Sequence, residues 1–277
     1  MGINAELVRL VADLRATHAF TGDSIIEMGA QDVCVAPEAV RQILAEYRID
    51  VSRSPSSDAS ELYGHLGFHR YRSIDASGSR GALVFDLNKD IRDYYQFLET
   101  FDVVTNLGTV EHCFNQFAVF KNVHDLCKRY GVMIHALPAQ GNVNHGFYNY
   151  HPRFVADLAA ANSYEMLELS FTVDYKPVLI KYSKEEFKKW DSHDLLFYAV
   201  LRRTNDAAFN LPFDGMFASS NRLSGYVSTS VDPLITEFSP YLKGGSWENT
   251  KGIRSDKVSL DGNRIKAFFR RLIPGLS

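Results

Sequence analysis

The chain has 277 residues, of which 45% are apolar and 23% are charged, and its formal net charge is −3. This is the composition of a globular protein, and it argues against intrinsic disorder. The slight negative charge gives no bulk attraction to nucleic acid, and no apolar run approaches the roughly 20 residues of a membrane-spanning helix. The three cysteines lack a C-x-x-C spacing, which favours a reducing compartment over a disulfide framework or a structural zinc site. We therefore expect a cytoplasmic protein, and the mixed charges of residues 1–20 do not predict a secretory signal peptide.

The N-terminal part of the sequence predicts a helix, a strand and a second helix. The first helix carries Leu7, Leu10, Val11 and Leu14 on one face. The run SIIEMG at 24–29 predicts a strand. A helix is expected over residues 37–47, since proline is favoured in the first turn of a helix. The serine-rich residues 52–60 predict a loop.

The middle of the sequence continues the alternation of strands and helices. Four apolar runs predict strands, at residues 71–74, 82–88, 101–108 and 131–138, and the last of them ends at a proline. A helix is expected after residue 108, and residues 152–171 predict a helix followed by another strand. This alternation favours right-handed crossovers and an α/β fold, in which a doubly wound, mostly parallel seven-stranded sheet carries helices on both faces.

The last part of the sequence has a different character from the rest. From about Asp206 it is rich in Ser, Gly, Asn and Pro, which predicts an irregular C-terminal segment. We therefore divide the chain into a sheet domain, residues 1–205, and a C-terminal extension, residues 206–277. The extension ends in a short basic amphipathic helix over NRIKAFFRRLI, residues 263–273. Such a helix can lie on an anionic membrane surface, but it can equally dock on its own domain, and we favour the second interpretation.

Ligands of doubly wound sheets bind at the carboxyl ends of the strands. The strand ends of this sequence carry short polar or small-residue motifs: EMGAQD at 27–32, SID at 73–75, FDLN at 85–88 and FDVVTNLGTVEH at 101–112. In this order the motifs resemble those of the class I S-adenosylmethionine-dependent methyltransferases, in particular the members that act on small molecules or saccharides. The resemblance covers about residues 24–171 and implies a Rossmann-like fold with S-adenosylmethionine as the cofactor.

The resemblance also implies cofactor-binding residues at each strand end. Glu27, Gly29 and Gln31 belong to the turn after the first strand, where glycine permits a close approach of the backbone. Asp75 would accept hydrogen bonds from the ribose hydroxyls. Asp86 would accept from the adenine amino group while Leu87 packs on the ring. The neighbouring pair Asn106 and Leu107 would face the methionine end of the cofactor.

The turn after the first strand departs from the family pattern. Ala30, Gln31, Asp32 and Val33 stand where further glycines are usual. A dinucleotide needs a glycine-rich turn that holds its pyrophosphate at a helix N-terminus, and Asp32 would oppose that anion. S-adenosylmethionine has no phosphate, so this departure favours the methyl donor over a nicotinamide cofactor.

The polar loop after residue 135 is expected on the acceptor side of the site. In HALPAQGNVNHGFYNYHPRF, His145 is our first candidate for the general base, because an imidazole pKa suits removal of a hydroxyl proton. His112 is the second. Glu111 beside it fits a cofactor contact equally well as a first-turn carboxylate favoured by the helix dipole. The aromatic residues of the loop fit either acceptor stacking or packing. No metal site is expected, because the sequence lacks an H-E-x-x-H spacing.

The sequence therefore predicts methyl transfer from S-adenosylmethionine to an oxygen or nitrogen of a small molecule or saccharide. A non-catalytic binding module with the same fold is the first alternative, motivated by the glycine-poor turn. A nucleic-acid methyltransferase is the second, although the acidic net charge argues against a nucleic-acid partner. A nucleotide-sugar or nicotinamide enzyme is a third. The sequence does not indicate the oligomeric state.

Overall fold

The computed structural model describes residues 2–49, 51 and 57–214. The predicted basic helix at 263–273 and the rest of the irregular C-terminal segment lie outside the described residues. Among the residues that are described, no helix is long and apolar enough to cross a membrane.

Helices and strands alternate through the first part of the chain, as the sequence predicts. The elements in this part are α1 (Ala5–Ala16), β1 (Ser24–Met28), α2 (Pro37–Glu46), α3 (Ala59–His65), β2 (Arg70–Ile74), a 3₁₀ turn (Ser79–Gly81), α4 (Ile91–Tyr95) and β3 (Phe101–Leu107). The second part comprises a 3₁₀ turn η2 (Val110–His112), α5 (Gln116–Leu126), β4 (Cys127–Gln140), α6 (Pro152–Asn162), β5 (Glu165–Val173), β6 (Ile180–Lys181), α7 (Lys184–Lys188) and β7 (Leu195–Arg202).

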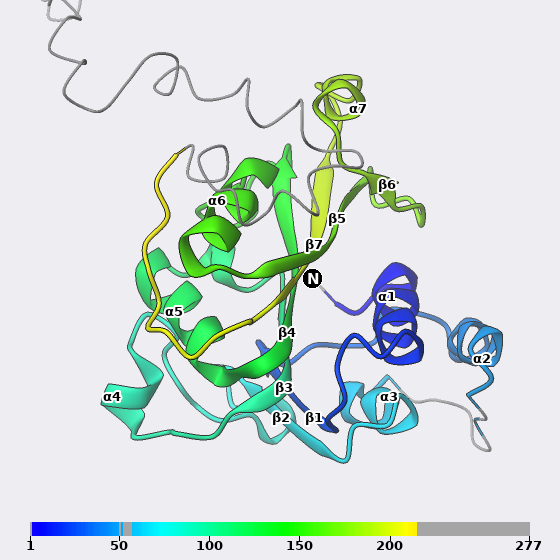
Figure 1. The fold of residues 1–277 in the computed structure, drawn as a ribbon. Helices are drawn as coiled ribbons and strands as arrows, with labels where there is room; N and C mark the ends of the chain where they lie inside the picture. Colours follow the sequence, from blue (N-terminus) through cyan, green and yellow to red (C-terminus); the bar gives the residue numbers. More distant parts are fainter. Residues whose placement is uncertain (1, 50, 52–56, 215–277) are drawn as a thin grey trace, which may run out of the picture. The chain divides into compact units, whose positions relative to one another are not determined.

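The strands form one seven-stranded sheet in the order β2-β1-β3-β4-β7-β5-β6. The pairs from β2 to β4 are parallel, and β7, β5 and β6 join through antiparallel pairs. Figure 1 shows α1, α2 and α3 on one face of this sheet and α4, α5 and α6 on the other. The predicted doubly wound α/β fold is thus confirmed, with an antiparallel half that the sequence did not indicate.

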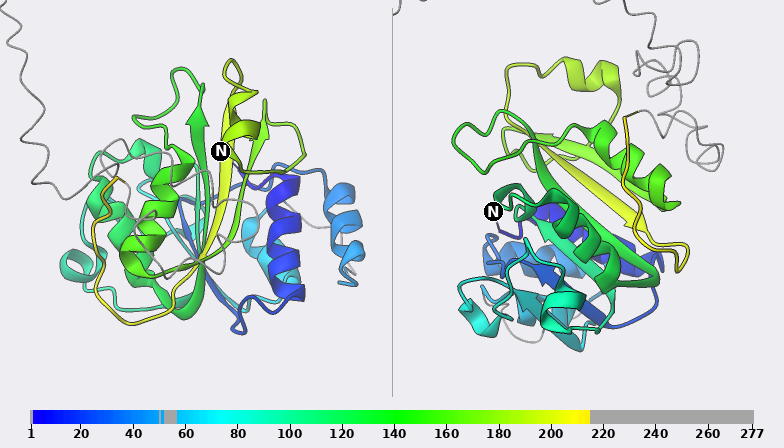
Figure 2. Two further views of the ribbon diagram at one scale, coloured as in Figure 1. Left: turned by 45° about the horizontal axis from the view of Figure 1, so that its top comes forward. Right: turned by 90° about the vertical axis from the view of Figure 1, so that its left-hand side faces the viewer.

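Two hydrophobic cores lie on the two faces of the sheet, because neighbouring strand residues point to opposite sides. In β1, Ile25 packs with α1, α2 and α3, whereas Ile26 packs with α5 and α6. Val103 and Val104 divide in the same way in β3. The left view of Figure 2 shows the sheet nearly edge-on between these two layers of helices. Burial on both faces explains why the central strands are continuous apolar runs.

The strand predicted at 82–88 is the clearest error in the predicted elements. Only Leu83 pairs with the sheet, through one parallel bridge to Ile74 on the outer side of β2. The chain then turns away, because the Asp86 N–H donates to the Tyr95 hydroxyl at 2.7 Å and Phe85 stacks on the Tyr95 ring with centroids 4.1 Å apart. Residues 84–88 therefore border the end of the sheet instead of extending it.

The end of β4 also differs from the prediction. Pro138 does not stop the strand, which continues to Gln140 and pairs with β7, with a register shift between Pro138 and Gln140. A local irregularity of this kind accommodates a proline, which lacks the N–H that a regular ladder needs.

With Leu83 in the place of an outer strand, the parallel half has the order 3-2-1-4-5 of doubly wound nucleotide-binding sheets. The connections reverse direction between β1 and β3. In sheets of this type the ligand binds at that switch point, beyond the carboxyl ends of the strands. This places the expected site beside Gly29, Asp75 and Gly108.

Candidate active site

A cavity of about 430 Å³ opens at the switch point, which is within the usual size range of small-molecule sites. Its lining comes from the ends of β1, β2 and β3 and from the segment that follows Leu83. The lining residues are Gly29, Ala30, Gln31, Ile74, Asp75, Ala76, Phe85, Asp86, Leu87, Asn88, Gly108, Thr109, His112 and Cys113. Six of the predicted site residues are among them: Gly29, Gln31, Asp75, Asp86, Leu87 and His112.

The turn after β1 requires glycine at position 29. Gly29 has φ +91°, and a Cβ there would lie 2.4 Å from the Thr109 hydroxyl oxygen. Its N–H donates to the Ile74 carbonyl at 2.7 Å, which ties the turn to the end of β2. The side chain of Gln31 reaches back to donate to the Thr109 hydroxyl at 3.4 Å. The turn and the end of β3 are thus held close together below the cavity.

Glu27 lies beneath this turn and does not line the cavity, contrary to its predicted place. It is fully buried and accepts hydrogen bonds from the hydroxyls of Tyr63 at 2.9 Å and Tyr71 at 2.7 Å. Its second oxygen also accepts from the Gln31 N–H at 3.3 Å. Burial raises the pKa of Glu27 to about 7, although the hydrogen bonds oppose this rise. Glu27 therefore supports the turn from inside the core.

Asp75 ends β2 with its carboxylate at the edge of the cavity. Its Oδ1 accepts from the N–H and hydroxyl of Ser77, and its Oδ2 accepts from the Ala30 N–H at 3.2 Å. Partial burial acts to raise the pKa of Asp75, but these hydrogen bonds outweigh it and hold the pKa below its ordinary value. Asp75 is therefore ionised at neutral pH and joins the ends of β1 and β2.

Asp86 provides a second carboxylate on the other side of the cavity. Its Oδ1 accepts from the backbone and side-chain amides of Asn88, both at 2.9 Å, and these bonds lower its pKa. The neighbouring Leu87 is buried against the core. The lining thus presents two ionised carboxylates, and it includes no Lys or Arg among the described residues.

Asn106 and Leu107 do not reach the cavity. The Asn106 side chain is buried, donates to His135 Nδ1 at 3.0 Å and accepts from the Val110 N–H at 3.4 Å. Leu107 packs in the core on the opposite face of the sheet. Their expected place is taken by Gly108 and Thr109, which directly follow β3.

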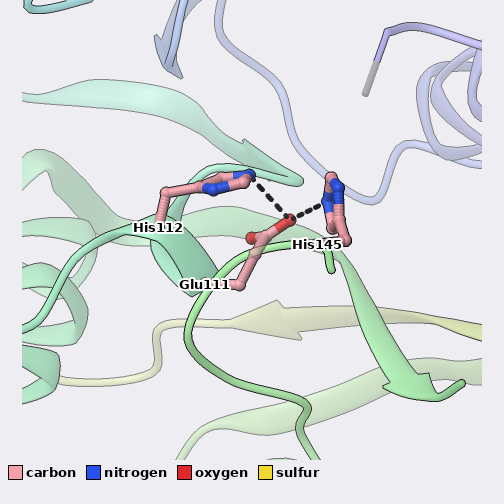
Figure 3. Close-up of side chains that lie close together, drawn as sticks. All are labelled: Glu111, His112 and His145. Atoms are coloured by element: carbon pink, nitrogen blue, oxygen red, sulfur yellow. Dashed lines mark hydrogen bonds and ion pairs between the residues drawn. The ribbon is translucent and has the colours of Figure 1, made fainter. Parts of the chain in front are cut away.

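Figure 3 shows that the side chains of Glu111, His112 and His145 meet. Glu111 and His112 belong to the 3₁₀ turn η2, whereas His145 comes from the loop after β4. Glu111 Oε1 lies 3.3 Å from His145 Nε2 and 3.9 Å from His112 Nε2. The two imidazole rings meet edge to face with centroids 4.8 Å apart. Since His112 also lines the cavity, this cluster adjoins it.

The loop that carries His145 is fastened to Glu111. The Phe147 N–H donates to the Glu111 carbonyl at 2.7 Å, and a Cβ at Gly146 would lie 2.8 Å from Glu111 Cγ. Gly146 has φ +67°, which favours glycine. The Glu111 side chain is fully buried between the histidines, and burial raises its pKa although its own backbone N–H and the two histidines act to lower it.

The aromatic residues of this loop divide between the two interpretations that the sequence left open. Tyr150 is buried and donates to the Gln116 side-chain oxygen at 2.6 Å, so it packs. Phe147 is 70% exposed, and Phe114, from the segment after η2, is 77% exposed. Tyr148 links the two segments through a hydrogen bond to the Phe114 carbonyl at 3.1 Å. An apolar aromatic rim thus borders the histidine cluster.

Several residues that line the cavity were not predicted from the sequence. Thr109, Asn88, Cys113 and Phe85 line the cavity without having been predicted. Each is within a few positions of a predicted strand end, and that proximity was the available signal. The sequence is compatible with Glu111 as a cofactor contact or as a first-turn carboxylate. Only the structure shows that it lies between two histidines.

No family model matches the sequence, and no curated protein matches it. Solved structures that match in fold include the 1,6-didemethyltoxoflavin-N1-methyltransferase of Burkholderia thailandensis, at 13% identity over 72% of this chain and 78% of that chain, with a TM-score of 0.38. The O-methyltransferase of a trans-AT PKS multienzyme of Brevibacillus brevis matches at 13% identity over 74% and 76%, with a TM-score of 0.40. TehB of Haemophilus influenzae matches at 10% identity over 70% and 62%, with a TM-score of 0.41. Two of these proteins are methyltransferases, the family that the motifs resemble, but similarity this distant carries no argument about the activity of this chain.

Proposed function

We propose that this protein transfers a methyl group from S-adenosylmethionine to an oxygen or nitrogen of a small molecule or saccharide. The observation that carries the proposal is the cavity at the switch point, with two ionised carboxylates, Asp75 directly after β2 and Asp86 in the segment after Leu83, and no Lys or Arg in its described lining. A nucleoside whose remainder carries an ammonium and a sulfonium suits such a lining. The cytoplasmic location remains a prediction from the sequence.

The surroundings of the first turn disfavour a dinucleotide in the same cavity. A pyrophosphate is bound by backbone N–H groups at a helix N-terminus. Here α2 begins only at Pro37, and no residue of α2 is in the lining. The nearby Asp32 forms an ion pair with Arg80. If this ion pair opened, the Asp32 carboxylate would place a negative charge beside a phosphate. Within the part of the chain that the structure describes, these features provide no anion site at the cavity.

Different lining residues would bind different parts of the cofactor. Asp75, which directly follows β2, would accept hydrogen bonds from the ribose hydroxyls, and Asp86 would accept from the adenine amino group. Leu87 and Phe85 offer apolar surface to the base. Gln31, Gly108 and Thr109 border the end nearest His112 and would hold the methionine part. Bound S-adenosylmethionine supplies an electrophilic methyl group that is transferred by direct displacement.

On the acceptor side, we assign His145 as the first candidate base and His112 as the second. Glu111 Oε1 lies 3.3 Å from His145 Nε2, and the tautomer in which Nε2–H donates to this carboxylate leaves Nδ1 able to take a proton. Phe147 and Phe114 would exclude water from the acceptor and align it, and alignment contributes much of the rate of a direct displacement.

The proposal is tested by calorimetric titration of the purified chain with S-adenosylmethionine, S-adenosylhomocysteine and NAD⁺. We expect binding of the first two and none of the third. Asp75→Asn should weaken S-adenosylmethionine binding by about tenfold or more, since a hydrogen bond to a charged group contributes about 1.5–3 kcal/mol. Asp93→Asn, an exposed carboxylate of α4 outside the lining, is the matched control and should bind as the wild type does.

Two results would contradict parts of this proposal. A folded wild type that binds neither methyl donor nor product would remove the cofactor assignment. Binding of both without formation of S-adenosylhomocysteine, across a panel of phenols, sugars and amines, would favour the alternative of a non-catalytic binding module. That alternative is motivated by the turn after β1, where Gly29 is followed by Ala30, Gln31 and Asp32.

A further inference from the structure

The cluster of Glu111, His112 and His145 has the composition of a metal site. Each side chain offers one ligand atom, and these atoms lie within 4.8 Å of one another. Two imidazoles and one carboxylate are a common ligand set for divalent transition metals in enzymes. We propose that this cluster binds one divalent transition-metal ion of the Zn²⁺, Fe²⁺ or Ni²⁺ type, next to the cavity.

The distances in the cluster are close to those that a metal ion imposes. With ligand bonds of about 2.1 Å, neighbouring ligand atoms are about 3.0–3.5 Å apart. His145 Nε2 and Glu111 Oε1 are 3.3 Å apart, which fits, while the 3.9 Å to His112 Nε2 requires only a small shift. The side chains of His112 and His145 are 49% and 36% exposed, so both rings have room to move.

The burial of Glu111 also favours a bound cation. Its side chain is fully buried, and Oε2 has no hydrogen-bond partner. An unpaired oxygen of a buried carboxylate costs free energy unless a cation or a proton compensates it. A metal ion held by Oε1 and the two rings would compensate the negative charge that Oε2 shares with Oε1.

The ligand types also select among metals. Imidazole nitrogen suits Zn²⁺, Fe²⁺ and Ni²⁺, whereas Mg²⁺ and Ca²⁺ prefer sites built of oxygen ligands. Three protein ligands leave coordination positions open, as in catalytic zinc sites. The open side borders the cavity through His112 and the aromatic rim through Phe147.

Metal binding does not depend on the proposed function, but its role in methyl transfer does. A bound metal ion lowers the pKa of a hydroxyl that it contacts. At this position it would orient an acceptor hydroxyl and favour loss of its proton to solvent. The histidines would then act as ligands, and the acceptor would be an alcohol, phenol or sugar hydroxyl and not an amine.

The experiment is titration of the tag-free, chelator-treated full chain with ZnCl₂, MnCl₂ and MgCl₂ in the absence of S-adenosylmethionine. We expect one equivalent of Zn²⁺ to bind, Mn²⁺ to bind more weakly and Mg²⁺ not to bind detectably. His145→Ala and His112→Ala should each weaken Zn²⁺ binding by about a hundredfold or more, because loss of mere supporting contacts already costs about 10–100-fold. The melting temperature of each variant, measured without metal, checks that it still folds, because each substitution removes a neighbour of the buried Glu111 carboxylate.

His193→Ala is the matched control. His193 Nδ1 lies 2.8 Å from the Asp174 carboxylate, which makes an exposed His–carboxylate pair outside the cluster. This variant should bind Zn²⁺ as tightly as the wild type. Titration with Co²⁺ provides an independent readout, since imidazole and carboxylate coordination produces a visible absorption that the His145 variant should lack.

Absence of stoichiometric Zn²⁺ binding to folded wild type would overturn the metal site, as would binding that neither histidine substitution weakens. Failure of the proposed function is distinguishable from this. If Zn²⁺ binds at the cluster but S-adenosylmethionine does not bind, the metal site stands and the methyltransferase proposal falls. If S-adenosylmethionine binds, Asp75→Asn weakens that binding and Zn²⁺ does not bind, the methyltransferase proposal stands and the metal site falls.

Discussion

Replacing Glu27 by Gln should change how the stability of the protein depends on pH. The carboxylate is fully buried beneath the turn after β1, and its pKa rises from 4.5 to about 7 on folding. The folded state therefore holds a proton on Glu27 between these two pH values, where the unfolded state has released it. In this window the contribution of Glu27 to the free energy of unfolding falls as pH rises, and this contribution is lowest above pH 7.

The magnitude follows from the size of the pKa change. A change of one pKa unit corresponds to about 1.4 kcal/mol, so the ionised Glu27 costs about 3 kcal/mol of stability above pH 7. Glutamine keeps the shape of the side chain and can still accept one hydrogen bond, for example from Tyr63 or Tyr71. Since glutamine does not ionise, the variant should not lose this 3 kcal/mol between acid and alkaline pH.

Other buried groups titrate in the same range, so the comparison must be between variant and wild type. Burial lowers the pKa of His124 and of His135 from 6.5 to about 4 in each case. Their contribution has the opposite sign, because stability is lost as pH falls from 6.5 toward 4. The wild-type profile therefore contains both trends, and the difference between the two proteins isolates Glu27.

The assay is urea unfolding of wild type and Glu27→Gln at several values between pH 5 and 8, with free energies from linear extrapolation. The variant should gain about 2–3 kcal/mol relative to wild type across this interval. Glu38→Gln removes a carboxylate that is 71% exposed on α2, and it should leave the profile unchanged. Parallel profiles for wild type and Glu27→Gln would refute the reasoning that burial holds a proton on this carboxylate.

Two glycine substitutions test the turn and the loop of the site. Gly29→Ala places a Cβ at φ +91° and against Thr109, so we expect a loss of about 1–2 kcal/mol or more and at least tenfold weaker S-adenosylmethionine binding, measured by thermal melting and calorimetry. Gly64→Ala, where a Cβ meets nothing within 4 Å, should leave both unchanged or raise the melting temperature slightly. Gly146→Ala should displace Glu111 and so reduce Zn²⁺ affinity while leaving S-adenosylmethionine affinity intact. Gly81→Ala has a similar φ of +72° without a close contact, and a loss of Zn²⁺ affinity there as well would attribute the effect to general strain.

The sequence predicted the parallel half of the fold well because that half is encoded locally. The strands β1 and β3 are short apolar runs buried on both faces, and each ends in a polar or small-residue motif. Asp75 and Asp86 were expected at the cavity for the same reason, since carboxyl ends of parallel strands meet at one edge of the sheet. In this half, a residue that directly follows a strand in the sequence is therefore expected at the cavity.

The antiparallel half was not predicted, because periodicity does not identify a strand's neighbours. The strand β7 is inserted between β4 and β5, although it follows both in sequence. Its alternate residues divide between the two cores as they do in the parallel strands. Nothing in that pattern gives its direction, which depends on the connection through β6 and α7.

Glu27 and Asn106 illustrate a second limit of sequence reasoning. Both are polar residues in or near the end of a strand, as Asp75 is, yet both side chains are fully buried and bonded inside the core. Neighbouring positions along a strand point to opposite faces of the sheet. Glu27 lies within β1 on the face covered by α3, where it meets Tyr63, whereas the cavity lies beyond the end of the strand and is lined by Gly29.

The acceptor side depends on a contact that local sequence could not give. His145 comes from a loop that follows β4, and it reaches Glu111 only because the Phe147 N–H binds the Glu111 carbonyl and Gly146 leaves space for its side chain. The pair Glu111–His112 alone is a first-turn motif with an ordinary structural explanation. With the third side chain in place, the cluster gains a buried carboxylate oxygen without a partner and a second imidazole. The chemistry of this site, base or metal, is therefore determined by the loop, and His145→Ala distinguishes the two because a general base alone gives no reason to bind Zn²⁺.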